Sequence, residues 1–354
     1  MRWMFLMLIF IPISILMNIF HASQVVMFII SCLAIIPLAG FMGVSTEEFA
    51  KYRGATIGGL LNATFGNATE LIICLVALHQ GEIEVVKASL IGSIIGNILL
   101  VLGLSVFLGG LKYKMQSFNP EGAGTHAAML AIAVISLLVP ALFVRVSPGM
   151  LELASEPRIF SLSMGVAGVL LLLYVSNLLF SLHTHQALFS IGEVEVSEAP
   201  TWSQRKAALV LLVCTLLVSL ESHFLVDSIE SVKAKWHLST LFIGIIVIPI
   251  IGNAAEHSTA VIMAMKNKMD LSFNIAVSSS IQIAMFVAPV LIIISPLLGH
   301  PMSILFHNSE LVAVSAAVAI AALIAMDGKS HWLEGAQLLA AYAILALAFY
   351  YIPS

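Results

Sequence analysis

Two copies of one short polar motif each place a glutamate and an asparagine inside a long apolar run. The first copy is Gly66-Asn67-Ala68-Thr69-Glu70-Leu71-Ile72, and the second, 186 positions later, is Gly252-Asn253-Ala254-Ala255-Glu256-His257-Ser258. An ionised carboxylate is costly in hydrocarbon, so a glutamate within such a run indicates a functional site. In each copy the asparagine and the glutamate are three positions apart, which would place them on one helix face.

A second pair of polar stretches follows the motifs at the same offset. Gly92-Ser93-Ile94-Ile95-Gly96-Asn97 aligns without a gap with Ser278-Ser279-Ser280-Ile281-Gln282-Ile283. Small residues also allow close helix packing in lipid, so packing alone is the alternative role for the glycines and for Ser278. The candidate metal ligands of the whole chain are Glu70, Glu256, Asn67, Asn253, Ser93, Asn97, Ser279 and Gln282.

These candidate ligands are carboxylates, carboxamides and hydroxyls, all of them hard oxygen donors. Such a set favours Ca2+, which accepts 6–8 oxygens in flexible geometry. Without the ion, the two carboxylates repel each other and are poorly solvated, and both effects favour protonation of Glu70 and Glu256. A site that holds either Ca2+ or protons is the minimal design of an exchanger. We therefore expect Ca2+ and H+ as transported substrates, with no resident cofactor.

The composition predicts an all-α polytopic membrane protein. Of the 354 residues, 60% are hydrophobic and only 10% are charged, and the net charge of -4 gives no basic field for nucleic acid. At about 20 apolar residues per span, we predict about 11 transmembrane helices: 3–19, 24–44, 55–79, 84–109, 124–145, 159–182, 206–228, 238–264, 271–298, 308–326 and 331–352. The first could instead be a signal peptide, but no small-x-small cleavage site follows it.

The offset between the motifs predicts two inverted repeats. Five helices in 24–182 correspond to five in 207–352, and an odd number reverses the direction in which the second set enters the membrane. Ion sites of such transporters lie near the midplane, between the repeats. Residues 1–20 form an extra helix, and 183–206 a linker. Gly66, Gly252 and Pro249 should kink or open the helices at the motifs.

The basic residues of the loops predict an orientation. Ten of the 15 Lys and Arg residues lie in loops on the side of the N-terminus and five on the other side. We expect a cytoplasmic N-terminus, an outside C-terminus and a multi-pass protein of the plasma membrane. Membrane lipid is then the surrounding partner, and the oligomeric state, a homo-oligomer included, stays open.

The paired motifs resemble the signature repeats of the calcium/proton exchangers, a family of the calcium/cation antiporter superfamily. The stretch 327–335 before the last predicted helix resembles that family too. The resemblance implies an eleven-helix fold, exchange of Ca2+ for H+ at Glu70 and Glu256, and sliding of the second and seventh helices against a rigid core. Glu193, Glu195 and Glu198 lie where relatives carry an acidic segment that is sometimes linked to Ca2+ sensing. So short a stretch favours a solvated linker over a regulatory site.

Two other functions remain as alternatives. A sodium/calcium exchanger would share the scaffold, but only two buried carboxylates are expected, and Gln282 stands where a third would favour Na+. An intramembrane enzyme such as a metalloprotease is a more remote alternative. The adjacent Glu256 and His257 are residue types that a metalloprotease uses, yet the chain has no His-Glu-x-x-His spacing. We therefore expect a transporter and not an enzyme.

Overall fold

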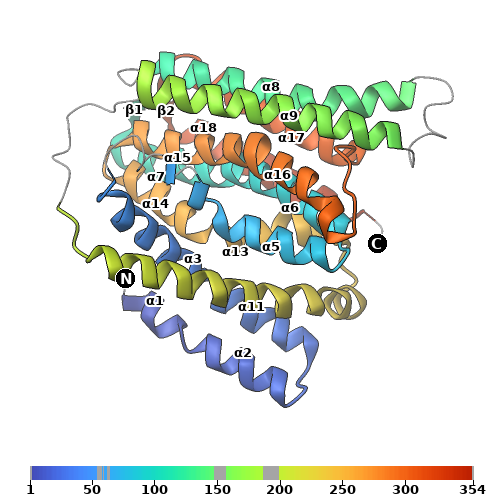
Figure 1. Cartoon of the computed structure of the whole chain (residues 1–354). Coiled ribbons are helices and arrows are strands. Elements are labelled where there is room, and N and C mark those ends of the chain that lie inside the picture. Colours follow the sequence, from blue (N-terminus) through green and yellow to red (C-terminus); the bar gives the residue numbers. More distant parts are fainter. Residues whose placement is uncertain are drawn as a thin grey trace. The chain divides into compact units, whose positions relative to one another are not determined.

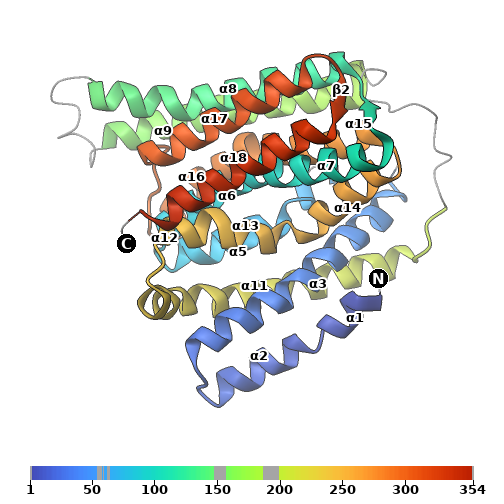
Figure 2. The same ribbon diagram turned by 180° about the vertical axis from the view of Figure 1, so that it is seen from behind.

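The computed structural model describes residues 2–53, 58, 60, 61, 64–146, 157–185 and 199–352. Its regular structure is helical apart from one two-stranded ladder (Figure 1 and Figure 2). Within these residues, 8 helices are long and apolar enough to cross a membrane, and a bent pair would make 9. Met4–Ile19 and Ala68–His79 are shorter apolar helices. The predicted all-α membrane fold is confirmed, while the number of eleven spans stays a prediction.

The chain forms two compact units. One comprises Met1–Ser89, Gly192–Ser258 and Ala346–Ser354, and the other comprises Leu90–Ile191 and Thr259–Leu345. Each unit takes residues from both halves of the sequence, so the units are not the predicted repeats. The boundaries of those repeats stay a prediction.

The first unit is built around two long helices, α3 (Gln24–Ala50) and α11 (Gln204–Trp236), which pack along each other. The N-terminal helix α2 (Phe10–Ile19) packs on both. The other elements with residues in this unit are α1 (Arg2–Met7), α5 (Ala68–His79), α6 (Ile83–Ile95), α12 (Thr240–Phe242), η3 (Ile243–Val247), α13 (Ile248–Gly252), α14 (Ala254–Met265) and the end of α18 (Trp332–Tyr350).

The second unit contains the ladder of β1 (Met115–Ser117) and β2 (Lys329–His331), in which Met115 pairs antiparallel with His331. Its helices pack closely, since a Cβ atom on Gly335 of α18 would lie 2.2 Å from the backbone nitrogen of Phe107. The remaining elements are η1 (Gly96–Val101), α7 (Leu102–Tyr113), α8 (Pro120–Val146), α9 (Pro157–Leu179), η2 (Phe180–Thr184), α15 (Met269–Gln282), η4 (Ile283–Val287), α16 (Ala288–Ile294), η5 (Ser295–Leu298) and α17 (Asn308–Ala325).

Several helix ends are separated by the offset of 186 that separates the motifs. Both ends of α5 and α14 match at this offset, as do the first residues of α6 and α15. The last residues of α3 and α11, Ala50 and Trp236, match as well. Helix bounds and motif residues therefore give the same internal alignment of the chain.

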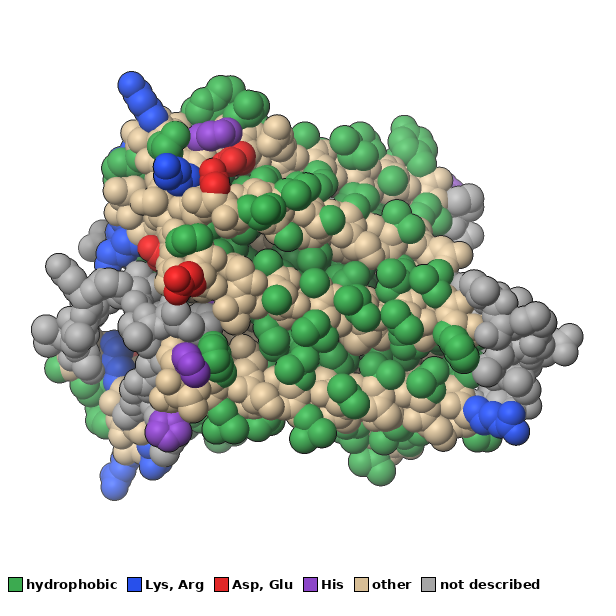
Figure 3. Space-filling model, turned by 90° about the horizontal axis from the view of Figure 1, so that it is seen from above, with side chains coloured by type: hydrophobic (Ala, Val, Ile, Leu, Met, Phe, Trp, Pro, Cys, Tyr) green, Lys and Arg blue, Asp and Glu red, His purple; other side chains and the backbone are tan. Residues whose placement is uncertain are grey.

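The longest helices extend beyond the predicted apolar runs. α3 continues six residues past position 44, and α11 continues to Trp236 rather than 228. Charged residues end an apolar run but not a helix, because pairs such as Glu230 and Lys233 stabilise the last turns in water. Figure 3 shows this distribution on one face: hydrophobic side chains cover the middle, and charged side chains lie toward the ends.

Candidate functional site

Both copies of the motif lie at breaks between helices. Asn67 stands in the turn before α5, and Asn253 stands between α13 and α14, where the helix axis bends by 63°. Their backbones agree closely, with φ of -99° at Asn67 and -94° at Asn253. The predicted opening of the helices is confirmed. The asparagines therefore lie in turns. The expectation that each asparagine shares a continuous helix face with its glutamate is wrong.

Each break places a glutamate in the first turn of the helix that follows. Glu70 is the third residue of α5, and Glu256 is the third residue of α14. The first backbone N–H groups of a helix have no partner within it and carry partial positive charge. A carboxylate is favourable there even before a cation binds, which is one physical reason for this arrangement.

The two motifs meet inside the first unit. The charge of Glu256 acts on the carboxyl group of Glu70. A Cβ atom on Gly252 would lie 3.1 Å from Glu70 Oε1, so this side chain rests against the backbone of the second motif. Glu70 is 4% exposed, and its Oε1 atom has no hydrogen-bond partner among the described residues. Glu256 is half-buried. A buried acceptor of this kind suits a cation or a proton.

The two asparagines are as buried as Glu70. Asn67 is 1% exposed and Asn253 is 2% exposed. Asn253 Nδ2 donates a hydrogen bond of 3.2 Å to the carbonyl oxygen of Pro249, which fixes the orientation of the side chain. Their carboxamides belong to the same unit as the two glutamates.

The second unit contains the other four predicted ligands. Asn97 Nδ2 donates to Ser279 Oγ at 3.0 Å, and both residues are buried. Ser93 is buried on α6, and Gln282 is half-buried at the end of α15. The π-helical segments η1 and η4 start beside Asn97 and Gln282, and such segments are frequent at functional sites. A role of these four residues as ion ligands stays a prediction.

The expectation of only two buried carboxylates is wrong. Glu221 and Glu310 are 0% exposed, and Glu48 is 5% exposed. The backbone N–H group of His307 donates a hydrogen bond to Glu310. The backbone N–H groups of Thr201 and Trp202 donate to Glu48.

Glu221 lies within the predicted span 206–228, so the apolar run around it was a signal that sequence reasoning missed. Glu310 lies in the first turn of α17, where an acid is favourable, and Glu48 lies in the last turn of α3, beyond the predicted span 24–44. Among the described residues, no group of three or more His, Cys, Asp or Glu could hold a metal, so amide, hydroxyl or carbonyl oxygens must complete any site at Glu70 and Glu256. Glu193, Glu195 and Glu198 lie outside the described residues.

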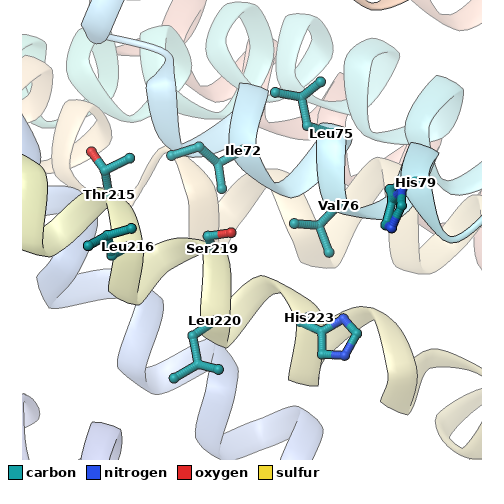
Figure 4. Close-up of a pocket in the computed structure, with 9 residues that line it drawn as sticks. All are labelled: Ile72, Leu75, Val76, His79, Thr215, Leu216, Ser219, Leu220 and His223. Carbon is teal, nitrogen blue, oxygen red and sulfur yellow. The ribbon is translucent and has the colours of Figure 1, made fainter. Parts of the chain in front are cut away.

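A cavity of about 650 Å³ lies between α5 and α11 (Figure 4). Its lining is mostly apolar, with His79 and His223 toward one end and Thr215 and Ser219 on α11. It contains no carboxylate, so it offers no ligand set for a hard cation. The carboxylate pair remains the candidate ion site of this unit.

The sequence matches the model of one protein family, described as sodium/calcium exchanger protein, over residues 23–183 and 206–351. The relatives include proteins named as Ca(2+)/H(+) antiporters and as a calcium ion transporter. The chain is 48% identical to a Ca(2+)/H(+) antiporter of Aphanothece halophytica, over 98% of this chain and 96% of that protein. It is 46% identical to the Ca(2+)/H(+) antiporter ChaA of Bacillus subtilis, over 96% of each. A vacuolar calcium ion transporter of Schizosaccharomyces pombe is 40% identical over 98% of this chain and 84% of that protein.

Solved structures share the fold. The structure of native YfkE is similar with a TM-score of 0.85 and 42% identity, over 99% of this chain and 100% of that one. The crystal structure of the H+/Ca2+ exchanger CAX reaches a TM-score of 0.75 at 13% identity, over 98% of this chain and 91% of that one. At that identity the second likeness concerns the fold alone.

Proposed function

Because the chain belongs to the sodium/calcium exchanger protein family, it is a multi-pass membrane transporter and not an enzyme, and we propose that it exchanges Ca2+ for H+ at Glu70 and Glu256. The observation that carries the proposal is the meeting of the two motifs: a buried Glu70 carboxyl group, unbonded at Oε1, within reach of the charge of Glu256. The names of the relatives, Ca(2+)/H(+) antiporters among them, support the same pair of ions.

The carboxylate pair explains coupling between the two ions. Two carboxylates balance the charge of one Ca2+, and two protons neutralise them equally well. The unoccupied pair would be two like charges in a poorly solvated place, which is unfavourable. The transporter therefore changes the side to which the site opens with either Ca2+ or protons bound, and transport of the two ions in opposite directions follows. Asn67 and Asn253 supply further oxygens.

Alternating access completes the proposal. The resemblance found in the sequence implies that the second and seventh predicted helices slide, and these are α3 and α11. Their tight mutual packing in the first unit supports a joint movement. We also propose a plasma-membrane location with the N-terminus in the cytoplasm, since basic residues favour that side. Reporter proteins fused to each terminus, one active only outside the cell and one only inside, test that orientation.

Exchange with Na+ is the second candidate function, because the family description includes it. The solved structure of a sodium-calcium exchanger is similar to this chain with a TM-score of 0.54 and 18% identity. At that identity the likeness concerns the fold and says nothing of which ions this chain transports. Selectivity must therefore be measured.

Uptake of radiolabelled Ca2+ into proteoliposomes tests the proposal. The vesicles are acidic inside, with or without a Na+ gradient, and Glu70→Gln and Glu256→Gln are compared with the wild type. Glu230→Gln is the matched control, because Glu230 is exposed on α11 and pairs with Lys233. We expect uptake driven by the pH gradient, indifferent to Na+, lost in the first two variants and kept in the control. Uptake driven only by Na+ would contradict proton coupling, and full uptake in either motif variant would contradict the site.

A further inference from the structure

A third carboxyl group, separate from Glu70 and Glu256, is enclosed among three helices of the first unit. Glu221 projects from α11, Ser14 from α2 and Ser31 from α3, and all three residues are 0% exposed. Ser14 Oγ and Glu221 Oε1 are 2.5 Å apart. Ser31 Oγ lies near the same carboxyl group, and neither Ser31 Oγ nor Glu221 Oε2 has a hydrogen-bond partner among the described residues. One polar contact thus joins α2 to α11, which packs along α3.

The surroundings of this carboxyl group are apolar. Cys214, Val218 and Leu225 share the buried face of α11 with Glu221 at helical spacing. Cys214 and Val218 belong to one hydrophobic cluster with Ile11 of α2 and residues of α3. An ionised carboxylate in such a place needs a cation or several hydrogen-bond donors.

No cation faces Glu221 among the described residues. α2 has no titratable side chain, and α11 also packs on α3 and α5. None of the titratable residues of α3 and α5, or of the middle of α11, forms an ion pair or a hydrogen bond with Glu221. These residues are Cys32, Glu47, Glu48, Glu70, Cys74, His79, Cys214, His223 and Asp227. His223 pairs with Asp227, one turn further along α11.

Ser14 Oγ lies within hydrogen-bond distance of two acceptor oxygens but has one hydrogen to donate. Ser14 Oγ is 2.7 Å from the carbonyl oxygen of Ile11 as well as 2.5 Å from Glu221 Oε1. A hydroxyl group carries one hydrogen, and a carbonyl oxygen can only accept. When Ser14 donates to Ile11, the contact with Glu221 is a hydrogen bond only if Glu221 is protonated and donates to Ser14 Oγ. Both contacts are then satisfied.

We propose that Glu221 is a proton-bearing carboxyl group whose O–H fastens the N-terminal helix α2 to α11, and that α3, which packs on both, moves with them as one body. Glu221 is thus a positioning residue and takes no part in binding Ca2+. The role in movement rests on the proposed function, whereas the protonated state and the fastening do not. A neutral hydrogen bond fits this task, because it joins helices in hydrocarbon without a buried charge.

Infrared spectroscopy of the full-length protein tests the protonated state. The starting protein is the Glu70→Gln/Glu256→Gln double variant, which removes the ion-binding pair. Its spectrum at neutral pH should contain a C=O band of a protonated carboxyl group. Adding Glu221→Gln should abolish that band, and adding Glu230→Gln should leave it. A band that Glu221→Gln does not change would overturn the proposal.

Thermal unfolding and transport test the fastening. Glutamine can donate to Ser14 Oγ as a carboxylic acid does, so Glu221→Gln should keep the unfolding midpoint and the exchange rate. Glu221→Ala and Ser14→Ala should lower both, whereas Ser222→Ala, a buried serine bonded within its own helix, is the control. If Glu221→Ala fails to fold, the unfolding midpoints and exchange rates of Ser14→Ala and Glu221→Gln still test the fastening. A Glu221→Gln variant as impaired as Glu221→Ala would contradict the neutral bond. Absence of exchange in the wild type would instead defeat the proposed function and leave the spectroscopic result standing.

Discussion

Glu70 and Gly252 stand in different copies of the repeated motif, and the carboxyl group of the first rests on the backbone of the second. Gly252 is the last residue of α13 and has a helical backbone, so alanine meets no conformational barrier there. The added methyl group would lie 3.1 Å from Glu70 Oε1, so the Glu70 side chain must shift by a few tenths of an ångström.

We therefore predict that Gly252→Ala weakens Ca2+ binding. Displacing a packed group costs about 1–2 kcal/mol, which corresponds to about a 5- to 30-fold rise in the KM for Ca2+. Thermal stability should change little, because the helix propensity of alanine offsets about 1 kcal/mol of that cost. Gly43→Ala is the control, since a Cβ atom there meets nothing within 4 Å. An unchanged KM in Gly252→Ala would show that Glu70 does not bind Ca2+ in this position.

Competition between protons and Ca2+ gives a second prediction. Carboxylates must lose their protons before they bind a metal ion, so Ca2+ affinity should fall as the pH falls and binding should release protons. Calorimetry in buffers of different ionisation enthalpy measures the number released. We expect close to two for the wild type and fewer for Glu256→Gln. A wild type that releases none would contradict shared binding of both ions.

The hydrogen bond from Asn97 to Ser279 provides a third test, within the second unit. Ser279→Ala leaves the buried Asn97 amide without this acceptor, at a cost of about 1–3 kcal/mol of stability. If the pair also ligates the ion, as the sequence predicts, the KM for Ca2+ rises in addition. Ser280→Ala is the control, because that buried hydroxyl bonds only to Ala276 of its own helix. Lost stability with an unchanged KM would assign the pair to packing alone.

Glu48 supports a fourth prediction, about the connection into α11. Its carboxylate accepts hydrogen bonds from Lys51 Nζ and from the backbone N–H groups of Thr201 and Trp202. Glu48→Gln weakens three hydrogen bonds to a charged acceptor and should destabilise the protein by about 1–3 kcal/mol. The neighbouring exposed Glu47, as Glu47→Gln, should have no measurable effect. Equal unfolding midpoints of the two variants would show that these bonds do not stabilise the fold.

The chemistry at the two motifs could be predicted from sequence because residue type and offset both point to it. Glu70 and Glu256 sit in matching contexts, each preceded by Gly-Asn-Ala, and Gly66 and Gly252 predict the breaks found at Asn67 and Asn253. The contact of Glu70 with Gly252 could not be predicted, because it depends on how closely two backbones approach.

Residues outside the two copies of the motif were harder to assign. Glu221 could have been found as an acid in an apolar run, but its partner could not. In a helix that is apolar all round, no periodicity shows which neighbour Ser14 faces. The π-helical segments could not be predicted for a similar reason, since hydrogen bonds between residues five apart instead of four have no signature in composition.

The ladder between Met115 and His331 has a consequence for how the protein is made. β1 is synthesised when about a third of the chain has been made, and its partner follows only shortly before the last helix. Until then the edge of β1 has no strand to pair with. The second unit is thus completed at the end of translation, and a ribosome that stalls before residue 329 holds a chain whose segments are inserted but whose ladder is still open.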